Sequence, residues 1–394
     1  MSDTPSSSFH ATPVFPRGFR CASRNVGLKP TARDLTLFAC DVDAAAAAVF
    51  TRNHFPGAPI TLGRETIRGG RLSAIVVNSK VSNVATGATG LANARRMAVA
   101  AAQELATSAD RVLVSSTGVI GVPLPIEKIE RGIAGISREL QDDPLVGALG
   151  IMTTDTHPKA LSMSVGAATI TWVAKGSGMI EPNMATMLAY IFTDAAFDAA
   201  ALDMMLRRAV SESFNTLSVD TDTSTSDTCV IRASGLAGPV DAAAFAEALR
   251  VGCIRMTEIL ARDGEGATRL IRVSVQGALT DAEAHVVARS IVNSPLVKTM
   301  VHGADPNVGR LLMAVGKCFD CTIVPSRTDA HINGFQVVGA GERLPFDDAI
   351  VRETLSREVV DLEVALGVGA GTARAYGCDL TKGYVDENAS YYSS

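Results

Sequence analysis

Strand-like and helix-like segments alternate along almost the whole chain, and this alternation restricts the fold more than any other feature. Short apolar runs have the length of buried strands, and longer segments carry apolar residues at helical spacing. The expected strands are residues 72–79, 111–121 (ending in a loop), 187–192, 267–278 and 373–381, with a hairpin over 161–175. The expected helices are 44–50, 91–106, 126–140, 198–217 and 241–264, the last two with Asp198 and Asp241 at the N-cap. This order predicts an α/β protein whose sheets are covered on both faces.

Composition narrows the class of protein further. The chain has 394 residues, of which 47% are hydrophobic and 20% charged, with a net charge of −5, so we expect a globular protein of two or three structural units. It lacks a basic stripe with interleaved aromatic residues, which argues against a nucleic-acid partner. No apolar run is long enough to span a membrane, and the polar, Pro/Ser-rich start does not resemble a signal peptide. Seven scattered cysteines are typical of reduced thiols in the cytoplasm.

The stretch KGSGMIEPNMATMLAY, residues 175–190, combines a turn with a buried strand. Its glycines, proline and asparagine are turn residues, and the apolar run that follows predicts a strand beginning at Thr186. From this pattern alone, Thr186 is a β-branched residue that fills a core strand. The alternative is a reactive hydroxyl placed directly behind a tight turn.

Other polar clusters follow strands, where α/β proteins place ligands. Thr117 and Gly118 come directly after an apolar strand, and a hydroxyl with a glycine amide can hold a developing oxyanion. Thr153 lies in the hydroxyl-rich stretch IMTTDTHPK, and Lys175 precedes the glycine turn. Glu265 lies between two glycines on an open loop. Each cluster also has a purely structural interpretation as a turn, a cap or a solvated charge.

Two patterns favour a metal only weakly. Asp220, Asp222 and Ser224 have the spacing of a calcium loop, but the glycine and glutamate of that loop are absent. Cys318 and Cys321 form a single C-x-x-C without a second pair. We therefore expect no metal site and no cofactor.

Taken together, the motifs resemble the ornithine acetyltransferase (glutamate N-acetyltransferase) family over nearly the whole chain. The segments that carry the resemblance are STGVIGVPLP, IMTTDTHPK, KGSGMIEPNMATML, DTDTSTSDT, DGEGATRLI, NSPLVKT, DPNVGR and YGCDLTKGYV. VHGADPN, GKC and MIEP are also similar to the family member found in the clavulanic acid gene cluster. The resemblance implies a layered α-β-β-α fold of the self-processing threonine-nucleophile type, like that of ornithine acetyltransferases and aminopeptidases.

The resemblance also implies an activity and its residues. The chain would cleave itself between Ala185 and Thr186 and then move an acetyl group from N2-acetyl-L-ornithine to L-glutamate by a ping-pong acyl-enzyme mechanism. Thr186 would be the nucleophile, and Thr117 and Gly118 would form the oxyanion hole. The implied substrate-binding residues are Thr153, Lys175, Thr186, Glu265, Asn388 and Ser393. Acetyl-CoA stays open as an additional donor.

The implied organisation is a flexible N-terminus over residues 1–20, an alpha fragment over 21–185 and a beta fragment over 186–394, with two copies of each fragment in the assembly. Lys80, Val81 and Val308 depart from the residues usual in the family, and the tail is one residue longer. These departures leave three alternatives: a self-processing amidase or aminopeptidase, an acyltransferase paralogue with another amine acceptor in a secondary pathway, and a non-catalytic binding protein.

Overall fold

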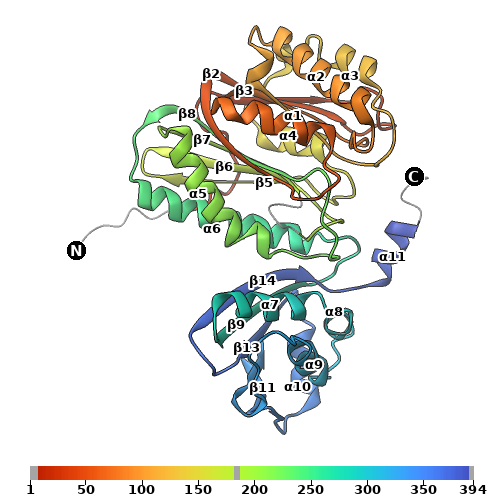
Figure 1. The fold of residues 1–394 in the computed structure, drawn as a ribbon, viewed down its shortest axis with the longest axis vertical. Coiled ribbons are helices and arrows are strands. Elements are labelled where there is room, and N and C mark those ends of the chain that lie inside the picture. The colour runs from red at the N-terminus through yellow and green to blue at the C-terminus, as the bar shows by residue number, and fades with distance from the viewer. Residues whose placement is uncertain (1–7, 182–186, 390–394) are drawn as a thin grey trace. The chain divides into compact units, whose positions relative to one another are not determined.

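The computed structural model describes residues 8–181 and 187–389. The chain forms two compact units (Figure 1). Within the described ranges, unit 1 holds residues 8–176, 187–215 and 223–256, and unit 2 holds 177–181, 216–222 and 257–389. Two short segments, 177–181 and 216–222, therefore leave unit 1 and belong to unit 2.

Unit 1 is built on one large sheet. In the described part of the chain the sheet has eight strands in the order β4-β3-β2-β8-β7-β6-β5, with β1 paired to β2. The strands are β1 (Phe19–Arg24), β2 (Leu35–Phe50), β3 (Arg71–Asn78), β4 (Val112–Ser116), β5 (Lys159–Val165), β6 (Ala168–Lys175), β7 (Leu188–Ala195) and β8 (Thr228–Gly238). The helices are α1 (Ala58–Thr66), α2 (Gly87–Glu104), α3 (Ile126–Ile133), α4 (Pro144–Ile151), α5 (Ala199–Ser211) and α6 (Ala242–Arg262), whose last turns belong to unit 2.

Both faces of this sheet bury apolar side chains. One cluster packs Leu35 and Leu37 of β2 with Met97 of α2. A second cluster contains Phe38, which points to the opposite side of β2 because side chains alternate along a strand, together with Tyr190 of β7. Burial on both faces explains why the strands of unit 1 are nearly continuous apolar runs, and it confirms the expected α/β class.

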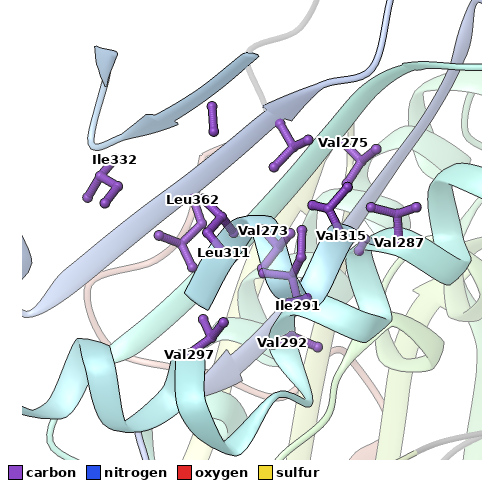
Figure 2. Close-up of a cluster of buried hydrophobic side chains, with 14 of the residues drawn as sticks. Val273, Val275, Val287, Ile291, Val292, Val297, Leu311, Val315, Ile332 and Leu362 are labelled. Atoms are coloured by element: carbon purple, nitrogen blue, oxygen red, sulfur yellow. The ribbon is translucent and has the colours of Figure 1, made fainter. Parts of the chain in front are cut away.

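Unit 2 has a smaller sheet that is covered by helices. Its strand order is β12-β11-β10-β13-β9-β14. The strands are β9 (Leu270–Ala278), β10 (Asp329–Ile332), β11 (Phe335–Gly339), β12 (Glu342–Arg343), β13 (Val359–Ala365) and β14 (Gly371–Cys378). The helices are α7 (Asp281–Val292), α8 (Pro295–His302), α9 (Gly309–Gly316), α10 (Asp348–Leu355) and α11 (Lys382–Ala389). Figure 2 shows Val273 and Leu362 of the sheet packed with Ile291 and Leu311 of the helices.

The strand and helix predictions are confirmed at most positions. The hairpin over 161–175 is the β5–β6 pair. Asp198 and Asp241 act as helix N-caps, since their carboxylates accept hydrogen bonds from the amides of Ala201 and Ala244 at 2.8 and 2.7 Å. The expected strand over 187–192 is β7, whose described residues begin at Leu188.

Two predictions of helix are wrong. Residues 44–50 are the second half of strand β2, where they pair with β8 from Ala45–Ala233 to Phe50–Thr228. Alanine has the highest helix propensity, but a central position in a sheet with bonding partners on its edges overrides that preference. The helix expected over 126–140 ends at Ile133, because Gly135 takes a left-handed conformation (φ +75°).

Candidate active site

The Thr117–Gly118 turn begins where strand β4 ends. Its amides are fixed by the loop that follows β3: Thr117 donates to the Asn78 carbonyl at 3.0 Å, and Val119 donates to the Lys80 carbonyl at 2.9 Å. Gly118 has φ +126°, and a β-carbon there would lie 2.2 Å from the carbonyl carbon of Lys80. Only glycine fits this position, since any side chain meets backbone that has no room to move.

Three of the predicted site residues meet at the end of strand β6. Lys175 is the last residue of β6 and is only 8% exposed. Its ammonium donates to the Thr153 hydroxyl at 2.8 Å and lies 3.5 Å from the Thr117 hydroxyl. The cluster therefore presents one buried positive charge and two hydroxyls beside the Thr117–Gly118 turn.

Asp155 underlies this cluster and was missed by the sequence analysis. Its carboxylate accepts hydrogen bonds from the amides of Thr153 (2.9 Å) and Gly176 (2.7 Å) and from the Lys159 ammonium (2.6 Å). Burial alone would raise the pKa of the Asp155 carboxyl, but the charges of Lys175 and Lys159 and the hydrogen bonds overcome it and lower the pKa to about 2. The four-residue spacing of Asp155 and Lys159 was the available signal.

Lys29 is a second residue that the sequence analysis missed. Its ammonium donates to the carbonyl of Met152 at 2.7 Å and so holds the residue before Thr153. Burial lowers the pKa of Lys29 to about 8, with the charge of Asp34 opposing this effect and that of Lys175 adding to it. No local sequence pattern marks Lys29, because its partners are distant in the chain.

Glu265 and Asn388 meet in unit 2. Glu265 follows helix α6 and is 9% exposed, and its carboxylate accepts a hydrogen bond from the Asn388 side chain on α11 at 2.7 Å. The carboxyl group packs against Gly178, where a β-carbon would lie 2.2 Å from it. The glycine predicted as a turn residue is therefore also a requirement of close packing.

Asp220 holds the turn that contains Gly178. Its carboxylate accepts hydrogen bonds from the amides of Met179 (2.6 Å) and Ile180 (2.8 Å). Burial raises the pKa of Asp220, and the hydrogen bonds oppose that shift. Asp220 is thus engaged with backbone, and the described residues contain no group of three or more acidic, histidine or cysteine side chains arranged to hold a metal. Among the same residues, no helix is both long and apolar enough to cross a bilayer.

Thr186, Ala185 and Ser393 lie outside the described residues, so their predicted roles stay predictions. The neighbouring strand is described: Leu188, two positions after Thr186 in the sequence, pairs with Lys175 in the β6–β7 ladder. The Met187 carbonyl accepts a hydrogen bond from the Thr228 amide at 2.9 Å. The strand that Thr186 precedes is thus next to the Lys175 cluster within unit 1.

Comparison with known proteins agrees with this site. The ArgJ family matches residues 20–393. The chain is 44% identical to the arginine biosynthesis bifunctional protein ArgJ 2 of Nostoc sp., covering 95% of this chain and 97% of that one. It is also 44% identical to the glutamate N-acetyltransferase Oat2 of Streptomyces clavuligerus, covering 97% and 99%. A crystal structure of the arginine biosynthesis bifunctional protein from Bacillus halodurans is similar, with a TM-score of 0.50 at 40% identity over 51% of this chain and 98% of that chain. The chain belongs to the ArgJ family.

Proposed function

We propose that this protein is a glutamate N-acetyltransferase that cleaves itself before Thr186 and moves an acetyl group from N2-acetyl-L-ornithine to L-glutamate. The observation that carries the proposal is the buried Lys175–Thr153–Thr117 cluster, which lies where β6 pairs with the strand that Thr186 precedes. A relative that is 44% identical along almost its whole length is named for the same activity.

Self-cleavage would make the nucleophile. The Thr186 hydroxyl attacks the Ala185 carbonyl, the acyl group shifts from nitrogen to oxygen, and water hydrolyses the resulting ester. The free α-amino group of Thr186 has an unperturbed pKa of about 7.7–8.0, so it can accept the proton of its own hydroxyl near neutral pH. This chemistry explains how the chain can activate a hydroxyl without a histidine.

Acetyl transfer then takes two steps on the same hydroxyl. Thr186 attacks the amide of N2-acetyl-L-ornithine, the carbon–nitrogen bond breaks, and ornithine leaves with a proton on its amine. The glutamate amine attacks the acetyl ester and regenerates the hydroxyl. In both steps the Thr117 hydroxyl and the Gly118 amide would stabilise the oxyanion, and the nearby Lys175 ammonium adds positive charge.

We assign the substrate-binding groups by charge. The buried Lys175 ammonium and the Thr153 hydroxyl suit the α-carboxylate that ornithine and glutamate share. Glu265, with Asn388 hydrogen-bonded to it, suits the side-chain ammonium of ornithine. Ser393, in the tail, completes the proposed set. This chemistry needs no metal or cofactor, and acetyl-CoA stays open as an additional donor.

The transfer reaction has a direct test. The purified protein is incubated with N2-acetyl-L-ornithine, with and without glutamate, and ornithine and N-acetylglutamate are quantified by mass spectrometry. Equal amounts of the two products, formed only with glutamate, support the proposal. Ornithine released at the same rate without glutamate indicates an amidase instead. No product from a chain that has cleaved itself indicates a paralogue with a different acceptor.

Self-cleavage is tested by the mass of the purified chain. Wild type should yield two fragments divided between Ala185 and Thr186, whereas Thr186→Ala should stay a single chain of 41.1 kDa. Thr186→Ser is the matched control, because serine keeps the hydroxyl and the amine and should still cleave. A Thr186→Ala sample that divides at the same bond contradicts the assigned nucleophile.

We further infer a cytoplasmic location and an assembly of two alpha and two beta fragments. All seven cysteines are described, and each is a free thiol, which fits a reducing compartment. In unit 1, strands of both fragments alternate in one sheet, with β7 between β6 and β8. The fragments should therefore stay associated after cleavage, and size-exclusion chromatography with light scattering measures the copy number.

A further inference from the structure

Asp155 is part of a buried group of charges beneath the Lys175 cluster. The side chains of Asp155 and Lys159 are both fully buried, and their charged atoms are 2.6 Å apart. A buried ion pair of this kind is a weak source of stability, because the loss of hydration offsets most of the attraction. Its presence beside a substrate-binding cluster therefore calls for an explanation other than stability.

The hydrogen bonds of Asp155 join the two chain segments that carry Thr153 and Lys175. One carboxylate oxygen accepts from the Thr153 amide at 2.9 Å, which fixes the loop after α4. The other accepts from the Gly176 amide at 2.7 Å, which fixes the chain directly after Lys175. The 2.8 Å hydrogen bond between the Lys175 ammonium and the Thr153 hydroxyl thus connects two segments that Asp155 already holds together.

We propose that Asp155 is a positioning residue that places Lys175 and Thr153 for recognition of the substrate α-carboxylate. The inference rests on the proposed function, because it assumes a substrate with that carboxylate. Asp155 does not contact the substrate in this account. It acts by fixing two backbone amides and by supplying the buried negative charge next to the Lys175 ammonium.

The competing explanation is that Asp155 only neutralises Lys159. The two explanations make opposite predictions for the double variant Asp155→Asn/Lys159→Met, which removes both charges of the pair and leaves no buried charge of that pair uncompensated. If Asp155 only neutralises Lys159, the double variant should bind substrate normally. If Asp155 positions Lys175 and Thr153, the double variant should stay impaired.

The experiment measures how strongly each variant prefers a substrate with the carboxylate. N2-acetyl-L-ornithine is compared with N-acetyl-1,4-diaminobutane, which has the same acetamide and terminal amine but no carboxylate. Wild type, Lys159→Met, Asp155→Asn and the double variant are assayed for kcat/KM on both donors. The matched control is Asp194→Asn, since Asp194 is also buried in unit 1 and accepts the Thr169 amide at 2.7 Å.

We expect the preference for the carboxylate-bearing donor to fall about tenfold to a hundredfold in the double variant, which is the range for losing a hydrogen bond to a charged group. The KM for N2-acetyl-L-ornithine and the KM for glutamate should rise together, with a smaller change in kcat. Lys159→Met and Asp194→Asn should keep the wild-type preference. A double variant with the wild-type preference overturns the inference, even if Asp155→Asn alone fails to fold. A wild-type protein that transfers no acetyl group would instead refute the proposed function.

Discussion

Replacing Gly118 by alanine should disable the site by moving the oxyanion turn. The new β-carbon would lie 2.2 Å from the carbonyl carbon and 2.3 Å from the carbonyl oxygen of Lys80. Both atoms are backbone, so the turn itself must shift. The φ of +126° costs an L-residue about 1–3 kcal/mol, and the overlap costs about 1–3 kcal/mol more in the free energy of unfolding. Displacing one oxyanion donor lowers kcat by a further factor of about 10²–10³.

Gly121→Ala is the matched control for this prediction. Gly121 lies three residues further along the same loop and has φ +79°, but nothing lies within 4 Å of its β-carbon position. It should therefore lose about 1 kcal/mol from backbone strain and keep its activity. The assay compares thermal melting, the rate of self-cleavage and the rate of acetyl transfer in the two variants. Equal transfer rates for Gly118→Ala and Gly121→Ala would refute the assignment of this turn.

Three further predictions concern individual residues. Lys175→Met should raise the KM for both substrates at least tenfold, as steady-state kinetics would show, and an unchanged KM would contradict its role as the carboxylate partner. Gly178→Ala should weaken activity by displacing Glu265, whereas Gly316→Ala, with nothing within 4 Å, should not, and the two variants are compared by the same assay. Because the folded pKa of Asp155 (about 2) is below its ordinary 3.8, its stabilisation of about 2 kcal/mol is present above pH 3.8 and is lost as the pH falls toward 2. Acid melting curves of wild type and Asp155→Asn should therefore converge over that range, and curves that stay parallel would contradict the shift.

The sequence predicted most of the elements because their local preference and their tertiary environment agree. The β5–β6 hairpin alternates as its burial requires, and the helices after Asp198 and Asp241 begin at good N-caps. The error at 44–50 has the opposite cause. The alanine run favours a helix locally, but pairing with β8 decides its structure, and pairing partners so distant in sequence leave no local signal.

The same distinction applies to the site. Thr117, Gly118, Thr153 and Lys175 were identified from motifs, and the structure brings them together. Asp155 and Lys29 were missed, because their importance lies in hydrogen bonds to backbone atoms of other segments, and such bonds do not require a recognisable side-chain pattern. A motif thus indicates the groups that contact substrate more readily than the groups that hold them in place.

The most direct test of the central claim follows the acetyl group itself. The self-cleaved protein is given N2-acetyl-L-ornithine without glutamate, and the mass of the fragment that begins at Thr186 is measured before and after glutamate is added. We predict that this fragment gains one acetyl group, which peptide mapping places on Thr186, and loses it to glutamate with an equal amount of N-acetylglutamate formed. An acetyl group on another residue, or its loss as free acetate when glutamate is present, would contradict transfer through Thr186.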